Sequence, residues 1–111
     1  MYFFLSFANR IEPYVKIKNG EFSWDENAPP ALTDLNIEIK PRQHVMIVGS
    51  VGAGKSSFLQ SILGEVPKLK GTVEVGGTLA YVPQQAWIFN ATVKENILFG
   101  KPFDRDRYLY Y

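Results

Sequence analysis

One short glycine-rich stretch carries the residues best suited to chemistry. Residues 49–56 read GSVGAGKS and fit the pattern G-x-x-x-x-G-K-[ST]. Its glycines allow sharp turns and close backbone approach, so successive backbone N–H groups can point at one anion. Lys55 would reach the outer groups of a phosphate chain, and Ser56 would ligate Mg²⁺. The stretch therefore predicts a phosphate-binding loop.

The loop is followed by a run that can form an amphipathic helix. Apolar side chains in residues 56–63 recur at helical spacing, and Gly64 stands where a helix C-cap glycine belongs. The N-terminus of such a helix adds positive partial charge, and Ser57 would meet the innermost phosphate. The bare pattern can arise by chance, but this setting favours phosphate binding. The predicted binding residues of the loop are Gly49, Ser50, Val51, Gly52, Ala53, Gly54, Lys55, Ser56 and Ser57.

Patterns typical of β-strands flank the glycine-rich loop and the helix that follows it. Residues 45–48, VMIV, form a continuous apolar run that predicts a strand buried on both faces. Asn19-Gly20 is a favoured hairpin turn, and Gly76-Gly77 joins two apolar segments. The two prolines within residues 24–31 predict a loop. The other expected strands cover residues 14–17, 21–24, 35–39, 72–75 and 79–82.

Two short helices are expected in the last part of the sequence. Thr92 and Glu95 have the spacing of a capping box, which predicts a helix that ends near Gly100. Asp104 is placed to cap a further helix that runs toward Tyr111.

Composition argues against several classes of function. The 111 residues carry a net charge of +1, which gives no reason to expect nucleic acid as a partner. The absence of cysteine excludes a disulfide framework and a thiolate metal site. The apolar stretch at residues 1–8 is shorter than the roughly 20 residues of a membrane-spanning helix, and it lacks the features of a signal peptide. We expect a domain over residues 14–111, with residues 1–13 as an N-terminal extension that is frayed or packed on a partner.

A second stretch indicates a particular family. Residues 79–100 read LAYVPQQAWIFNATVKENILFG, which resembles the Q-loop region of ABC transporter nucleotide-binding domains. The similarity is greatest to the first such domain of the multidrug-resistance-associated, or C-type, transporters. Residues 18–40, KNGEFSWDENAPPALTDLNIEIK, resemble the opening of that domain, so the resemblance covers about residues 14–100. It implies binding of ATP and Mg²⁺ at the cytoplasmic face of a membrane.

Two further residues gain roles from this resemblance. Trp24 matches the aromatic residue that stacks on adenine, and a core tryptophan is the alternative. Gln84 matches the Q-loop glutamine, which in the family contacts Mg²⁺ and the attacking water, with Gln85 as the neighbouring choice of register. The resemblance thus implies Lys55 and Gln84 as catalytic residues, and Ser56 and Gln84 as metal contacts.

The resemblance also implies protein partners. The family docks the coupling helix of its transmembrane domain on a segment that here contains Trp87, Ile88, Phe89 and the helix from Thr92. Packing into a local core is the alternative for these residues. A second nucleotide-binding domain would be the other partner in a parent transporter.

Several parts of the family's domain have no match in this sequence. No LSGGQ-type signature, Walker B strand with its acids, or switch histidine follows the Q-loop segment. The implied fold class is an incomplete α/β P-loop NTPase: an N-terminal antiparallel β subdomain, the phosphate-loop strand and helix, and the Q-loop strand, with unpaired strand edges. We expect ATP binding but very slow hydrolysis, because the base that activates water is missing. The alternatives are a non-catalytic nucleotide-binding or interaction fragment and a different P-loop enzyme, which the Q-loop segment disfavours.

Overall fold

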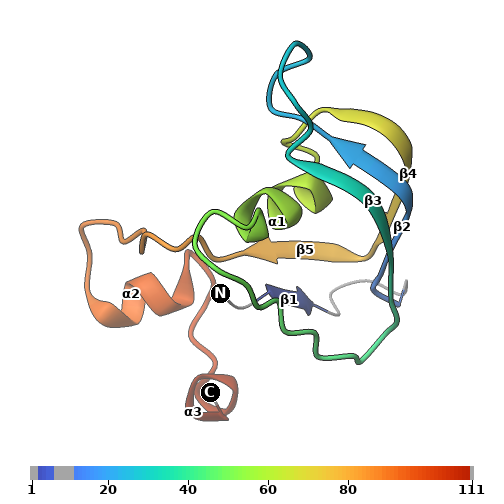
Figure 1. Ribbon diagram of the computed structural model, residues 1–111. Coiled ribbons are helices and arrows are strands. Elements are labelled where there is room, and N and C mark those ends of the chain that lie inside the picture. The colour runs from blue at the N-terminus through green and yellow to red at the C-terminus, as the bar shows by residue number, and fades with distance from the viewer. Residues whose placement is uncertain (1–2, 7–11, 111) are drawn as a thin grey trace.

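The computed structural model describes residues 3–6 and 12–110 (Figure 1). It contains a three-stranded antiparallel sheet, a helix packed against it, a separate strand pair and two short helices. In chain order the elements are β1 (Phe3–Ser6), β2 (Tyr14–Phe22), β3 (Leu32–Ile39), α1 (Lys55–Leu63), β4 (Lys68–Gly76), β5 (Thr78–Tyr81), α2 (Val93–Leu98) and α3 (Arg105–Tyr110).

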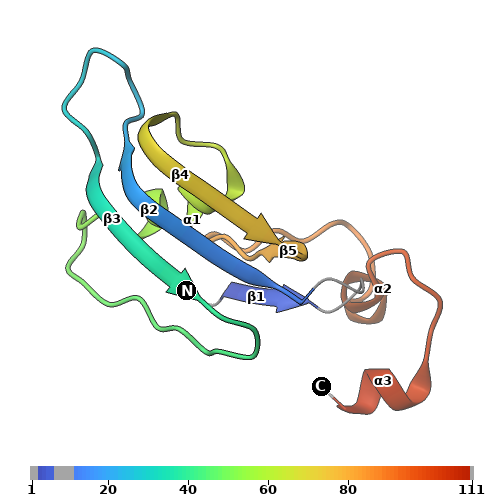
Figure 2. The same ribbon diagram turned by 90° about the vertical axis from the view of Figure 1, so that its right-hand side faces the viewer.

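The three-stranded sheet has the order β3-β2-β4, with β2 in the centre (Figure 2). Alternate residues of a strand point to the same face, and Val15 and Ile17 are buried on one face of β2. Ile17 lies opposite Ile37 of β3 and Val73 of β4, so apolar side chains meet across the sheet. The expected antiparallel β subdomain is confirmed.

Asn19 and Gly20 do not form the predicted hairpin turn. β2 runs through them without reversing, and its register with both neighbouring strands shifts there. Asn19 takes a left-handed conformation, with φ of 49°, and its N–H donates to Asn36 Oδ1 at 3.0 Å. Pairing along both edges of β2 outweighs the local turn preference, so the dipeptide makes a bulge inside one long strand. The two strands predicted around it were therefore wrong as separate elements.

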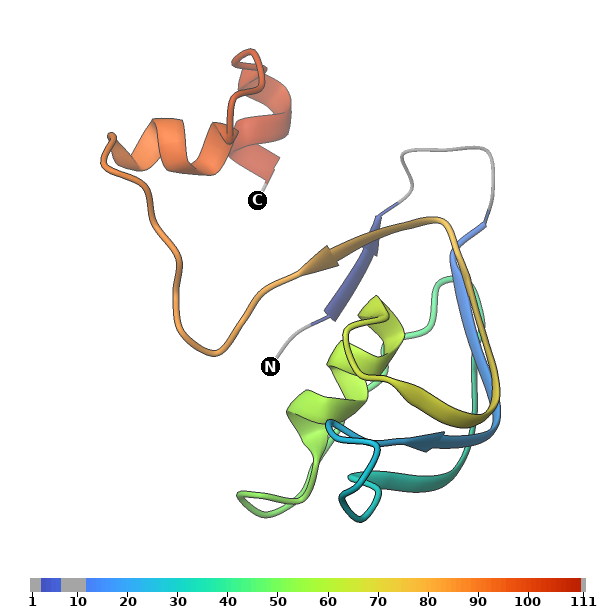
Figure 3. The ribbon, with the colours of Figure 1, turned by 90° about the horizontal axis from the view of Figure 1, so that it is seen from above.

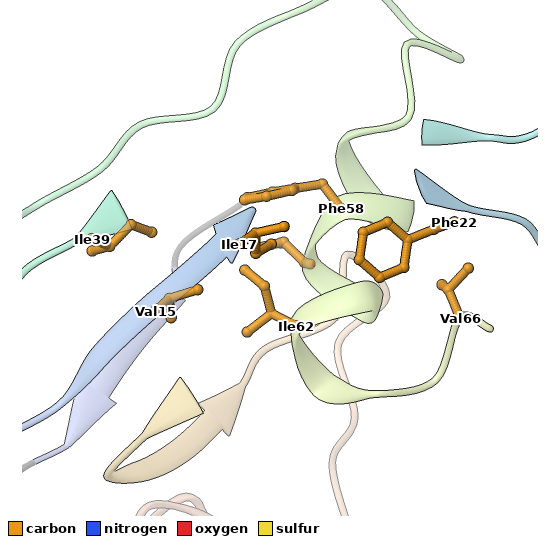
Figure 4. Packing of buried hydrophobic residues seen from close by; sticks show 8 residues of the cluster. Val15, Ile17, Phe22, Ile39, Phe58, Ile62 and Val66 are labelled. Carbon is orange, nitrogen blue, oxygen red and sulfur yellow. The ribbon is translucent and has the colours of Figure 1, made fainter. Parts of the chain in front are cut away.

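The core lies between this sheet and α1 (Figure 4). α1 contributes Phe58, Leu59 and Ile62, which are at most 7% exposed and share one face of the helix. Gly64 ends α1 with φ of 82°, and its N–H donates to Ser61 O at 3.2 Å. The predicted helix and its glycine C-cap are confirmed.

Residues 45–48 do not form the predicted buried strand. They lie in the irregular link between β3 and α1, and no strand of the described structure pairs with them (Figure 1). Their exposed fractions are 47% for Val45, 75% for Met46, 37% for Ile47 and 81% for Val48. A strand buried on both faces needs neighbours and cover that residues 3–6 and 12–110 do not supply at this position. The described structure thus contains the phosphate-loop helix of the expected α/β fold but not its strand.

β4 and β5 confirm the strands expected at residues 72–75 and 79–82. Gly77 has φ of 85° and turns the chain between them. The two strands belong to different sheets, because β4 is an edge of the three-stranded sheet and β5 pairs with β1.

The expected N-terminal extension, residues 1–13, is described only in part. The backbone of Phe3–Ser6 pairs antiparallel with β5, with Leu5 opposite Leu79. Residues 1–2 and 7–11 lie outside the described structure. β5 therefore has a hydrogen-bonded neighbour that the sequence patterns did not indicate.

α2 begins at the predicted capping box. Thr92 Oγ1 accepts from the Glu95 N–H at 3.2 Å, and the Thr92 N–H donates to Glu95 Oε2 at 2.8 Å. Asp104 Oδ1 accepts from the Arg107 N–H at 3.1 Å, so the predicted start of α3 is also confirmed. Both helices lie apart from the three-stranded sheet (Figure 3). Among the described residues, no helix has the length and apolar character needed to span a bilayer.

Candidate functional site

Residues 49–54 form a loop that leads directly into α1. Gly54 is the N-cap of α1, with φ of 89°, and no side chain of the described residues caps the helix. The loop closes on itself through the Ala53 N–H, which donates to Ser50 O at 3.2 Å. The first backbone N–H groups of an α-helix have no acceptor within the helix. The N-terminus of α1 therefore presents free donors and positive partial charge beside the loop.

Gly52 and Gly54 serve the loop in different ways. Gly52 has φ of 80°, but a Cβ added there would meet no atom of the described residues within 4 Å. A Cβ at Gly54 would lie 3.1 Å from Leu32 Cδ2, at the start of β3. A side chain at position 54 would thus be both strained and crowded, so glycine there lets the loop pack on β3.

Lys55 is held against the backbone of its own loop. Its Nζ donates to Gly49 O at 2.7 Å and to Ser50 O at 2.6 Å. These acceptors are neutral, and an ammonium binds a charged oxygen more strongly than a neutral one. An anion in the loop would therefore compete favourably for this side chain.

Trp24 lies beside the first turn of α1. Its Nε1–H donates to Ser57 Oγ at 3.1 Å, so the structure brings these two predicted site residues together. The indole is 52% exposed, which does not fit the alternative of a core tryptophan. Ser23 anchors the preceding position, because it is buried and its N–H donates to Pro67 O at 3.1 Å. An aromatic surface is thus accessible next to the phosphate loop.

Gln84 and Gln85 lie in a bend after β5, and both are exposed. Among the described residues, no hydrogen bond joins either side chain to the loop at residues 49–57. Within the described part of the chain, the structure therefore does not bring either glutamine into contact with the phosphate loop through a hydrogen bond.

Three aromatic rings gather where α2 begins and ends. The ring centroids of Trp87 and Phe89 lie 6.0 Å apart, those of Trp87 and Phe99 5.9 Å, and those of Phe89 and Phe99 6.3 Å. These three residues form what we call the aromatic cluster. Trp87 and Phe99 are each 68% exposed, so the cluster packs internally while most of its surface stays accessible.

Asn96 is a structural residue that the sequence patterns did not indicate. Its Oδ1 accepts from the Phe89 N–H at 3.1 Å, and its Nδ2 donates to Phe89 O at 3.1 Å and to Thr92 O at 3.0 Å. The amide thereby ties the segment before α2 to the helix. The only signal in the sequence was an asparagine one turn after the predicted N-cap.

A hollow of about 430 Å³ lies beside the aromatic cluster. Its apolar surface comes partly from three exposed side chains: Ile88 is 74% exposed, Val93 76% and Ile97 59%. Its lining residues are Ile88, Phe89, Asn90, Ala91, Val93, Asn96 and Ile97.

The capping box gives a testable pH dependence. The Thr92 backbone N–H, and secondarily its hydroxyl, hold the pKa of Glu95 below its ordinary value. Because the folded-state pKa is lowered, the cap stabilises α2 above the ordinary glutamate pKa and loses this contribution as the pH falls through the folded-state pKa. We expect Thr92→Val to raise the pKa of Glu95 only part of the way, since the backbone N–H remains.

NMR titration of the Glu95 side-chain carboxyl measures this effect. Thr72→Val is the matched control, because Thr72 is an exposed threonine on β4, far from this cap in the chain. An identical Glu95 titration in Thr92→Val and in the unsubstituted chain would contradict the role of the hydroxyl.

Comparison with known proteins supplies the family. The family described as ABC transporter matches residues 32–109, a span that includes the loop, α1, Gln84 and α2. The chain belongs to the ABC transporter family. The resemblance of residues 79–100 to the ATPase domain of that family is thereby confirmed.

Relatives of this ABC transporter chain include C-subfamily members from animals and plants. ATP-binding cassette sub-family C member 3 of Rattus norvegicus is 52% identical over 94 residues, covering 85% of this chain and 6% of that protein. ABC transporter C family member 6 of Arabidopsis thaliana is 52% identical over 98 residues, covering 87% of this chain and 7% of that protein. ATP-binding cassette sub-family C member 2 of Mus musculus is 46% identical over 94 residues, covering 85% of this chain and 6% of that protein. The chain thus corresponds to a small portion of these transporters, within the ATPase domain.

Proposed function

We propose that this ABC ATPase portion binds ATP–Mg²⁺ through residues 49–57. The observation that carries the proposal is the uncapped N-terminus of α1 with the Lys55 ammonium held against the preceding loop. The free backbone N–H groups, the positive end of the helix dipole and the Lys55 ammonium lie together at this end of α1. A triphosphate needs such a concentration of donors and positive charge. Membership of the ABC transporter family supports ATP among the phosphate-bearing ligands.

Each part of the site has a proposed role toward the nucleotide. The N–H groups of residues 51–57 bind phosphate oxygens, and Lys55 exchanges its backbone acceptors for the β- and γ-phosphates. Ser56 would hold Mg²⁺ through its hydroxyl, and the ion would neutralise part of the triphosphate charge. Ser57 contacts the α-phosphate. Trp24 offers its exposed ring to adenine, in keeping with its position beside α1.

We propose that the parent protein is a C-subfamily exporter and that this portion lies in its first nucleotide-binding domain, at the cytoplasmic face of the membrane. The exposed aromatic cluster and the hollow beside it would dock the transmembrane domain. A second nucleotide-binding domain would complete the hydrolytic site, in which Gln84 contacts Mg²⁺ and the attacking water. The similarity to C-subfamily transporters supports this assignment.

Binding of ATP–Mg²⁺ is tested by calorimetric titration of the unsubstituted chain. We expect saturable binding of ATP–Mg²⁺ and no detectable binding of adenosine, because most of the proposed contacts are to phosphates. Equal affinity for ATP–Mg²⁺ and adenosine, or no binding of either, would rule out the proposed phosphate site.

Turnover by the chain alone is expected to stay at the background rate. The 111 residues contain no Walker B acid or LSGGQ-type signature, and hydrolysis of a bound triphosphate depends on positioning and activating water. A steady-state phosphate-release assay, with Lys55→Ala as the control for contaminating ATPase, measures it. Robust turnover that Lys55→Ala abolishes would contradict this expectation. A non-catalytic nucleotide-binding or interaction role is thus the second candidate for this chain, favoured by the exposed aromatic cluster.

A further inference from the structure

In the hydrogen bond between Trp24 and Ser57, the chemistry of the indole decides which group donates. The indole Nε1–H can only donate, and the 3.1 Å contact therefore makes Ser57 Oγ the acceptor. A hydroxyl group has one donor and two acceptor positions. The Ser57 proton must consequently point away from Trp24.

The Ser57 hydroxyl retains its donor for another partner. Among the described residues, the bond from Trp24 is its only hydrogen bond. Ser57 lies in the first turn of α1, where the free backbone donors also lie. The proton is thus available on the same side-chain atom that the indole contacts, at the helix end suited to an anion.

Trp24 and Ser57 come from separate parts of the fold that the core holds together. Trp24 follows β2 and is 33 residues from Ser57 in the sequence. Phe22 of β2, two residues before Trp24, and Phe58 of α1, directly after Ser57, are buried at 1% and 7% exposure. The contact therefore joins two elements whose relative position is already set by packing.

We propose that Ser57 is a positioning residue that couples the Trp24 ring to the phosphate loop. Its hydroxyl accepts from the indole N–H and donates to a phosphate oxygen, forming the chain Trp24 Nε1–H···Ser57 Oγ–H···O–P. Hydrogen bonds in such a chain polarise and strengthen one another. The ring is thereby oriented for a stacked base at the moment when the innermost phosphate binds. This inference rests on the proposed binding of ATP and deepens it.

The coupling predicts a signal from a ligand that has no base. The chain has two tryptophans, so Trp87→Phe leaves Trp24 as the sole indole fluorophore. In this background we expect tripolyphosphate–Mg²⁺ to shift the emission of Trp24, because the phosphate engages the hydroxyl that the indole contacts. Ser57→Ala should abolish that shift, and Ser57→Thr, which retains a hydroxyl, should preserve it.

The same variants separate positioning of the base from contact with the phosphate. Calorimetry gives the ratio of the affinities for ATP–Mg²⁺ and tripolyphosphate–Mg²⁺. We expect Ser57→Ala to lower this ratio by about threefold to tenfold, the range of one hydrogen bond. In a Trp24→Phe background, where no N–H is present, Ser57→Ala should leave the ratio unchanged.

Ser61→Ala is the matched control on the same helix. Ser61 lies one turn after Ser57, is buried, and donates to Phe58 O at 2.6 Å. This variant should alter neither the emission shift nor the affinity ratio.

Failure of the inference can be distinguished from failure of ATP binding. If Ser57→Ala weakens both ligands equally and keeps the emission shift, Ser57 is only a phosphate contact and the coupling is overturned. If neither ligand binds to the unsubstituted chain, the proposed function fails and the coupling fails with it.

Discussion

Replacing Lys55 by alanine is expected to weaken binding of ATP–Mg²⁺ by about tenfold to a hundredfold. A hydrogen bond to a charged group contributes about 1.5–3 kcal/mol, and about 1.4 kcal/mol corresponds to a tenfold change in affinity. The variant removes the ammonium, now 2.7 Å from Gly49 O and 2.6 Å from Ser50 O, and with it the proposed bond to the charged phosphates. Alanine is a good helix former, so α1 should persist. Isothermal titration calorimetry measures the affinity directly.

Lys40→Ala is the matched control for the loss of one positive charge. Lys40 is exposed, follows β3 and lies outside the loop. β3 runs for 8 residues from Leu32, which lies beside Gly54, to Ile39, and a strand rises about 3.3 Å per residue. Lys40 therefore lies beyond the roughly 8 Å over which exposed charges interact at physiological salt, and this variant should bind ATP–Mg²⁺ like the unsubstituted chain. Equal affinities of Lys55→Ala and the unsubstituted chain for ATP–Mg²⁺ would contradict the proposed phosphate site.

Replacing Phe22 by alanine is expected to lower the free energy of unfolding by about 3–5 kcal/mol, the usual range for a buried phenylalanine. Phe22 is 1% exposed, and its ring lies beside α1, toward Val66 (Figure 4). Small domains have total stabilities of about 5–15 kcal/mol. The loss would therefore be a large fraction of the stability that holds Trp24 beside α1.

Urea denaturation followed by circular dichroism measures this loss. Leu109→Ala is the control, because Leu109 lies on α3 and is 68% exposed. Substitutions at such exposed positions usually change stability by about 0.5 kcal/mol or less. A similar midpoint for Phe22→Ala and Leu109→Ala would show that the cluster around Phe22 is not the core.

Local sequence signals predicted the parts of the molecule that depend on neighbouring residues. Gly54 and Lys55 lie in the loop and first helical turn that their pattern indicated, and Gly64 ends α1 as expected. The capping box of Thr92 and Glu95 is present in full. These features need only a few adjacent residues, whose backbone preferences and short hydrogen bonds decide the local conformation.

The contact between Trp24 and Ser57 depended on the tertiary structure. The sequence suggested roles for both residues through the family resemblance, but not a bond between them. Packing of β2 against α1 brings Trp24 Nε1 to 3.1 Å from Ser57 Oγ. Periodicity along one segment carries no information about such a distance between segments.

The phosphate-loop pattern, the helix termini and the family could all be predicted from the sequence, because each depends on contiguous residues. Which apolar runs become strands depended on contacts between distant segments. Pairing on both edges of β2 overrides the Asn19-Gly20 turn signal, and residues 45–48 pair with no strand within residues 3–6 and 12–110 despite a strong strand pattern. A strand needs a neighbouring strand to supply its backbone hydrogen bonds, and a strand buried on both faces needs cover on both sides as well.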